Sequence, residues 1–227
     1  MRIIFVRHGH PDYKNDCLTP LGHEQAKAAA QRLKDEQVET IYSSVKGRAM
    51  ETASYQAQMH GLEVVPLDFM REIGWGSVDG EPVAHDGHPW FLVEDMVAAG
   101  QSLLSDNWAE EPPFDRSRAV GFYNNIKENL DIWLSGLGYD REGDSYRVRE
   151  KNDKTVMLVS HGGSSSCAIS HLFNLPLPFV LRNIPANFTG ITIVKLTGEA
   201  GSLTTPRFEM VNDARHINGV TEPTYDN

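Results

Sequence analysis

The chain has 227 residues, a length that indicates one large domain or one domain with a sizeable insertion. Hydrophobic residues make up 40% of it and charged residues 23%, which leaves enough apolar side chains for a buried core. The formal net charge of −10 argues against a protein that wraps a nucleic-acid backbone. An anionic substrate would need a local positive pocket, because the overall field does not attract it.

The two cysteines and the first residues bear on the compartment. Cys17 and Cys167 are far apart and form no Cys-x-x-Cys motif, so we expect no disulfide framework. The apolar run at 2–6 is too short for a secretory signal, and no later run approaches a membrane span. We therefore expect a cytoplasmic protein that does not enter a membrane.

The first third of the chain alternates strand-like and helix-like segments. Residues 2–6 form a continuous apolar run, which is typical of a strand buried on both faces. Thr19 as N-cap and Pro20 as first helical residue open a predicted helix that reaches Gln37. The other elements predicted here are a strand at 38–43, a helix at 46–60 and a strand at 63–67. This order favours an α/β fold with a mainly parallel sheet.

The pattern weakens beyond Gly74, where glycine, proline and aspartate accumulate as far as Pro113. We expect residues 76–113 to be an inserted cap segment with one helix, near 90–99. The later predictions are an amphipathic helix at 119–137, a charged loop at 138–153, a strand at 155–159, a helix at 164–173, strands at 189–196 and 207–211, and an irregular tail from Asn212. We predict one domain over 1–227, a three-layer αβα sandwich with a mostly parallel sheet.

Two predicted strands run into a histidine that is followed by glycine, in Arg7-His8-Gly9 and in Ser160-His161-Gly162. Ligands bind at the carboxyl ends of strands in open α/β sheets, and glycine lets the backbone approach a ligand closely. A third strand end, at Ser44, opens the helix that carries Arg48. We expect these groups to meet at one edge of the sheet.

These residue types suit the transfer of a phosphoryl group. A phosphate monoester is dianionic, so planar cations such as Arg7 and Arg48 would neutralise it. A neutral imidazole is a competent nucleophile near pH 7, and a second imidazole can donate to the charged oxygens. A nearby acid must then protonate the leaving oxygen.

Four motifs in this order resemble the histidine phosphatase superfamily, the phosphoglycerate mutase-like group. The resemblance covers residues 2–75 and 154–196 and is poor between Gly76 and Asp153. The motifs are Val6-Arg7-His8-Gly9, Leu18-Thr19-Pro20-Leu21-Gly22, Ser43-Ser44 with Arg48-Ala49 and Glu51-Thr52-Ala53, and Ser160-His161-Gly162-Gly163.

The resemblance implies that His8 is the phosphorylated nucleophile. It implies that Arg7, Arg48 and a protonated His161 hold the phosphoryl oxygens. The segment from Met70 to Gly80 is similar in outline to one that carries the family's acid, which makes Glu72 the acid/base candidate. The candidate substrate-binding residues are Asn15, Ser44 and Gly162.

The chain also departs from the family's pattern. His10 stands where an acidic or small polar residue is usual, and the loop from Gly9 to Leu18 is short. The phosphate-binding asparagine is therefore out of register, although Asn15 could fill its role. The long tryptophan-containing signature of the mutases is absent, which favours a phosphatase.

Several alternatives remain at this stage. His8 and His161 could be structural histidines, and Ser44 could be a helix N-cap. His85 and His88 suggest a metal site, but no third ligand is evident near them. The loop His8-Gly9-His10-Pro11-Asp12 could also belong to a metallophosphatase, but a cation site would not have Arg7 and Arg48 as neighbours. The chain could instead be a phosphomutase or a non-catalytic sensor of a phosphorylated ligand.

We predict that the enzyme needs no metal and no organic cofactor. We expect its partner to be a small phosphorylated metabolite, not a nucleic acid or a membrane. The sequence predicts neither the identity of the substrate nor the oligomeric state.

Overall fold

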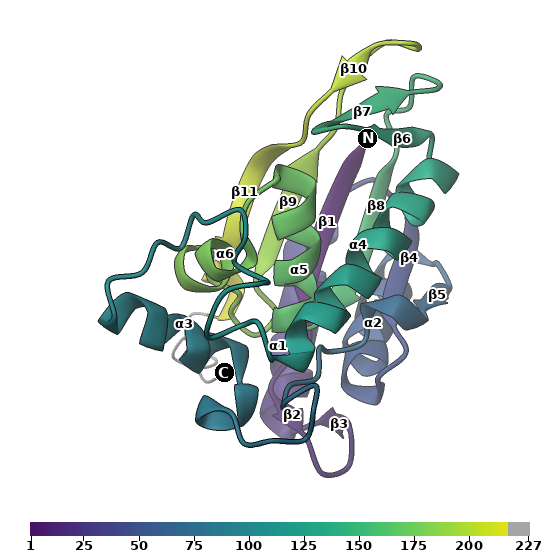
Figure 1. Ribbon diagram of the computed structural model, residues 1–227. Helices are drawn as coiled ribbons and strands as arrows, with labels where there is room; N and C mark the ends of the chain where they lie inside the picture. Colours follow the sequence, from purple (N-terminus) through teal and green to yellow (C-terminus); the bar gives the residue numbers. More distant parts are fainter. Residues whose placement is uncertain (218–227) are drawn as a thin grey trace.

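The computed structural model describes residues 1–217, around a six-stranded sheet with strand order β11-β9-β1-β8-β4-β5 (Figure 1). Its strands are β1 (Arg2–Arg7), β4 (Val38–Ser44), β5 (Val64–Leu67), β8 (Thr155–Ser160), β9 (Ile191–Lys195) and β11 (Arg207–Asp213). β1, β8, β4 and β5 pair in parallel, whereas β9 is antiparallel to both of its neighbours. Every strand of this sheet except β9 therefore points the same way.

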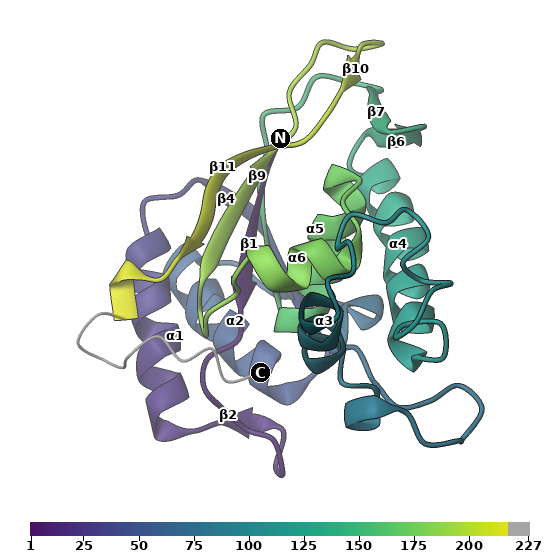
Figure 2. The same cartoon turned by 60° about the vertical axis from the view of Figure 1, so that its left-hand side comes forward.

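Helices cover both faces of the sheet (Figure 2). The layer on one face consists of α1 (Pro20–Leu33) and α2 (Gly47–His60). The layer on the other face consists of α4 (Arg118–Gly136) and α5 (Gly162–Phe173), with α6 (Leu177–Asn183) beside α5 and α3 (Pro89–Ala98) beside α6. The predicted three-layer αβα sandwich with a mostly parallel sheet is confirmed.

The side chains of β1 explain why this strand is apolar throughout. Ile3 and Phe5 belong to the buried cluster under α4 and α5, and Ile4 and Val6 belong to the cluster under α1 and α2. Successive side chains of a strand point to opposite faces, so a strand with helices on both sides buries all of them. β8 is likewise buried from end to end.

The start of α1 follows the sequence signal. Thr19 is the N-cap, its side chain accepts a hydrogen bond from the Gly22 backbone at 3.1 Å, and Pro20 is the first helical residue. α2 ends at His60 because Gly61 adopts a left-handed conformation, with φ of 67°.

The expected loop at 138–153 was wrong in part, because it contains a β-hairpin. β6 (Tyr139–Glu142) pairs with β7 (Ser145–Val148), and β10 (Leu203–Thr204) adds a third strand. Buried and more exposed residues alternate along β7, where Tyr146 and Val148 are fully buried. The charged residues around them hide this alternation in the sequence. Three further elements, α6, β2 (Pro11–Asp12) and β3 (Cys17–Leu18), were not predicted.

The segment at 76–113 holds the short 3-10 helix η2 (Ala84–Gly87) and α3, close to the predicted helix at 90–99. Two other 3-10 helices are η1 (Asp68–Met70) and η3 (Arg215–Ile217). The rest of the predicted irregular tail, 218–227, lies outside the described residues. A single domain over 1–227 stays a prediction for the same reason. Within residues 1–217, no helix combines the length and the apolar character that crossing a membrane requires.

Candidate active site

The parallel pairing of β1, β8 and β4 brings three predicted groups to one edge of the sheet. The register places Arg7 beside Ser160, so the two histidines that follow emerge side by side. The rings of His8 and His161 are buried, and their centroids are 5.0 Å apart at an angle of 65°. Two imidazoles at this separation can contact the same tetrahedral anion.

The tautomer of His8 is set by its own loop. Nδ1 lies 2.7 Å from the Gly9 carbonyl oxygen, and because a carbonyl only accepts, Nδ1 carries the proton. The lone pair on Nε2 then faces the Nε of Arg48, which donates to it at 3.2 Å. Burial, followed by the charge of Arg7, holds the pKa of His8 well below its usual value of 6.5. His8 is therefore neutral at pH 7.

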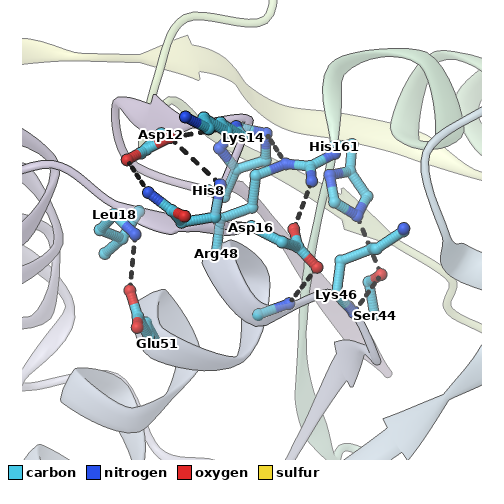
Figure 3. Close-up of polar contacts among 12 residues, drawn as sticks. His8, Asp12, Lys14, Asp16, Leu18, Ser44, Lys46, Arg48, Glu51 and His161 are labelled. Carbon is cyan, nitrogen blue, oxygen red and sulfur yellow. Dashed lines mark hydrogen bonds and ion pairs between the residues drawn. The ribbon is translucent and has the colours of Figure 1, made fainter.

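Arg48 lies on the first turn of α2 and is held by a residue that the sequence did not single out. Its Nη1 pairs with the Asp16 carboxylate at 2.5 Å, and the other oxygen of Asp16 accepts from the Gly47 backbone N–H at 3.0 Å (Figure 3). A Cβ on Gly47 would lie 2.0 Å from the Asp16 carbonyl oxygen. Glycine at the start of this helix is the one signal that could have indicated this close approach.

Arg7 is only 7% exposed and lines a cavity together with residues of α3, α5 and α6. Its Nη1 donates to the Ala186 carbonyl at 2.6 Å, and its guanidinium lies 4.2 Å from the ring centre of Phe188. Its buried Nε has no hydrogen-bond partner among residues 1–217. A buried donor without a partner is costly, so this nitrogen is available for an oxygen of a bound anion.

His161 and Ser44 form the third side of the site. The His161 Nε2 lies 2.9 Å from the Ser44 Oγ, which also accepts from the Lys46 backbone at 3.3 Å (Figure 3). Burial and the neighbouring His8 hold the pKa of His161 well below 6.5. A protonated His161 in the presence of the transferring group stays a prediction. A bound dianion would raise the pKa again, because it favours the charged form.

Glu72 approaches from the segment after β5. Its Oε1 accepts from the Ile73 backbone at 3.0 Å and from the Ser164 backbone, in the first turn of α5, at 3.1 Å. The residue is partly exposed, but its carboxyl group is enclosed at this helix end. Burial raises the pKa of Glu72 above its usual value, against the opposing effect of Arg7. A raised pKa favours the protonated form of a carboxyl group, which is the form that an acid catalyst needs.

The remaining candidates differ in their position. Gly162 is buried, and a Cβ there would lie 3.5 Å from the Arg7 guanidinium, so its backbone borders the site. Asn15 is exposed, and its side-chain amide donates to Asp12 at 2.7 Å. Its role as a phosphate ligand stays a prediction. Tyr13, missed by the sequence, is 63% exposed, and its ring lies 5.3 Å from the Arg48 guanidinium.

The histidines that suggested a metal lie apart from this group. His85 pairs with Asp95 at 3.1 Å on the surface, and His88 packs against the rings of Trp75 and Phe91. Within the part of the chain that the structure describes, no three side chains of His, Cys, Asp or Glu are grouped as a metal site requires.

Glycine at position 163 is required by the approach of Glu72. A Cβ on Gly163 would lie 2.6 Å from the Glu72 Oε1 and 2.5 Å from a side-chain carbon of Ile73. We expect Gly163→Ala to lower the free energy of unfolding by about 1–3 kcal/mol, because overpacking outweighs the gain in helix propensity. The measurement is urea denaturation.

Gly162→Ala is the matched control for this substitution. Its nearest new contacts, to Arg7, begin at 3.5 Å, an ordinary van der Waals distance. We expect it to change the free energy of unfolding by less than ~1 kcal/mol. Equal effects of the two substitutions would contradict the position of Glu72.

Known proteins resemble this chain in sequence. The sequence model of the histidine phosphatase superfamily (branch 1) matches residues 3–128. Phosphoserine phosphatase 1 of Hydrogenobacter thermophilus is 27% identical over 175 residues, 71% of each chain. The 2,3-bisphosphoglycerate-dependent phosphoglycerate mutase of Corynebacterium diphtheriae is 26% identical over 230 residues, 90% of this chain and 89% of its own.

The fold is also found in solved structures. A mutant phosphoserine phosphatase of Entamoeba histolytica, in complex with phosphoserine, superimposes with a TM-score of 0.62 at 20% identity. The superposition covers 95% of this chain and 98% of the other. Since the superfamily model spans more than half of the sequence, this chain belongs to the histidine phosphatase superfamily, branch 1.

Proposed function

We propose that the chain is a phosphatase that hydrolyses small phosphate monoesters through a phosphohistidine on His8. The observation that carries the proposal is the hydrogen bond from Nδ1 to the Gly9 carbonyl oxygen, which leaves the lone pair on Nε2. The lowered pKa keeps the ring neutral. A neutral nucleophile between two guanidinium groups suits attack on a dianionic ester.

The proposed first half-reaction transfers the phosphoryl group to the enzyme. The His8 Nε2 attacks phosphorus in line, and the bond from phosphorus to the ester oxygen breaks. Arg7, Arg48 and His161 hold the other phosphoryl oxygens, where charge develops. Glu72 gives its proton to the leaving oxygen, so that the alcohol departs neutral.

The proposed second half-reaction returns the free enzyme. The Glu72 carboxylate takes a proton from water, whose oxygen attacks phosphorus while the bond to Nε2 breaks. Phosphate leaves, and His8 regains its lone pair. We further propose that no metal ion is needed, because the two arginines supply the positive charge, and that the protein acts in the cytoplasm on a small metabolite.

The segment at 76–113 is proposed to cap this site within a single domain. Its helix α3 carries Trp90, and a ring carbon of Trp90 lies 3.7 Å from the position of a Cβ on Gly162. The segment thus reaches the first turn of α5, next to Arg7. A cap here would exclude water from the transferring group.

A phosphomutase is the second candidate. The relative in Corynebacterium diphtheriae is named as a mutase, whereas the Hydrogenobacter thermophilus and Entamoeba histolytica proteins are named as phosphatases. The two reactions share phospho-His8 and differ in whether water or a second hydroxyl group captures the phosphoryl group. Dependence on a bisphosphorylated primer would favour the mutase.

The covalent step can be tested by substitution of two neighbouring histidines. We expect His8→Asn to abolish phosphate release from p-nitrophenyl phosphate and to prevent labelling by a ³²P-ester, because it removes the attacking nitrogen. His10→Asn is the matched control, because its Nδ1 bonds Thr19 at 2.9 Å. Acid-labile label in His10→Asn but not in His8→Asn, with a chelator present, is the expected result. If the His8→Asn protein still became labelled, His8 would not be the nucleophile.

The role of Glu72 can be tested through the leaving group. An alkoxide needs a proton, whereas p-nitrophenolate leaves readily without one. We expect Glu72→Gln to lower kcat for an alkyl phosphate by about 10²–10⁴ and to affect p-nitrophenyl phosphate far less. In a plot of kcat for the alkyl phosphate against pH, the fall at alkaline pH should also vanish, because that fall reports loss of the Glu72 proton as the pH rises. Equal losses on both substrates would exclude Glu72 as the acid.

A further inference from the structure

The loop between β2 and β3 brings one further side chain to the arginines of the site. The two short strands pair in antiparallel fashion, so residues 13–16 form the tip of a hairpin. Tyr13 is the first residue of this tip, and the centre of its ring lies 5.3 Å from the Cζ of Arg48. The same guanidinium group donates to the His8 Nε2 at 3.2 Å. Only the Arg48 side chain therefore separates Tyr13 from the proposed nucleophile.

The hydroxyl group of Tyr13 lies next to the second arginine. Burial lowers the pKa of Arg7, and this shift is opposed first by Glu72 and then by Tyr13, which acts on the guanidinium group as a hydrogen-bond partner. A guanidinium group only donates, so the phenol oxygen accepts and the hydroxyl hydrogen stays free for another acceptor. Tyr13 therefore holds a hydrogen-bond donor beside the two cations that are proposed to bind the phosphoryl oxygens.

The hairpin tip is fixed at both of its ends. At the first end, the Asp12 carboxylate accepts from the backbone N–H of Asn15 at 3.2 Å and from the Asn15 side-chain amide at 2.7 Å. At the second end, Asp16 pairs with Arg48 and with the Gly47 backbone (Figure 3). A donor that is already held in position needs little reorganisation when an anion binds.

The same bonds distinguish the two polar side chains of the tip that could bind an anion. The amide of Asn15 is directed to Asp12, whereas Tyr13 contacts both arginines and is 63% exposed in the ligand-free protein. We propose that Tyr13, and not Asn15, is the residue of this loop that binds the phosphoryl group, by donating its hydroxyl hydrogen to a phosphoryl oxygen. This inference rests on the proposed function and adds a ligand to the transferred group.

Tyr13→Phe tests the hydroxyl group alone, because it keeps the ring beside Arg48. We expect kcat/KM to fall about tenfold for both p-nitrophenyl phosphate and propyl phosphate, because the lost donor binds the group that the two esters share. The dissociation constant of orthovanadate, measured by isothermal titration calorimetry, should rise by a similar factor. Equal losses on the two esters also distinguish Tyr13 from Glu72, whose substitution should affect mainly the alkyl ester.

Two further variants serve as controls. Tyr55→Phe removes a hydroxyl group that bonds the His23 Nδ1 at 3.2 Å, between α2 and α1, and it should leave both measurements as in the wild type. Asn15→Ala should change them by less than about twofold. Unchanged values in Tyr13→Phe, or a larger loss in Asn15→Ala than in Tyr13→Phe, would overturn the inference.

The calorimetric measurement separates this inference from the proposed function, because it needs no turnover. If the wild type bound orthovanadate but hydrolysed neither ester, the proposed function would fall. The ratio of the orthovanadate dissociation constants of Tyr13→Phe and the wild type would then still support or overturn the role of Tyr13. If the wild type neither bound orthovanadate nor hydrolysed an ester, both proposals would fall.

Discussion

The parallel alignment of β1 with β8 is the constraint on which the site depends. The His8 backbone N–H donates to the Ser160 carbonyl oxygen at 2.9 Å. The hydrogen bonds between β1 and β8 therefore continue to the ends of the two strands. Both strands are buried on both faces, and a slip of one residue would move their apolar side chains to the wrong side. The sheet thereby fixes the distance between the imidazoles of His8 and His161, which are more than 150 residues apart in sequence.

Burial then determines the protonation of this group. Burial lowers the pKa of both histidines, with a further contribution from the two neighbouring guanidinium groups, and burial also raises the pKa of Glu72. The ligand-free site thus combines permanent positive charge with a neutral base and a carboxyl group that resists ionisation. An acidic protein can attract a phosphate ester in this way, because the local field at the strand ends opposes the net charge.

The sequence predicted the parts of the site that lie on regular elements. His8, His161 and Arg48 follow strands or open a helix, and their positions come from the topology of a parallel sheet. Asp16, Tyr13 and Phe188 were missed, since their contacts depend on the path of loops between distant elements. The lowered pKa of His161 could not be predicted either, because it depends on burial and on the spacing of charges, which no motif records.

The same limit applies to the contact between α3 and α6. The pair formed by Glu94 and Arg182 joins two helices that are 88 residues apart at these positions, and neither residue belongs to a motif. The cavity of about 360 Å³ beside this pair takes Trp90 and Glu94 from the segment with poor resemblance to the family. It takes Arg7, Gly162 and Arg182 from the segments that resemble the family.

The central claim is that His8 and His161 face one phosphoryl-sized site together with Arg7 and Arg48. A crystal structure of the protein with vanadate, which mimics the transferring group, tests it most directly. The account predicts vanadium bonded to the His8 Nε2, with its oxygens within hydrogen-bond distance of both guanidinium groups and His161. Vanadate bound elsewhere, or in this site without a bond to Nε2, would contradict the account.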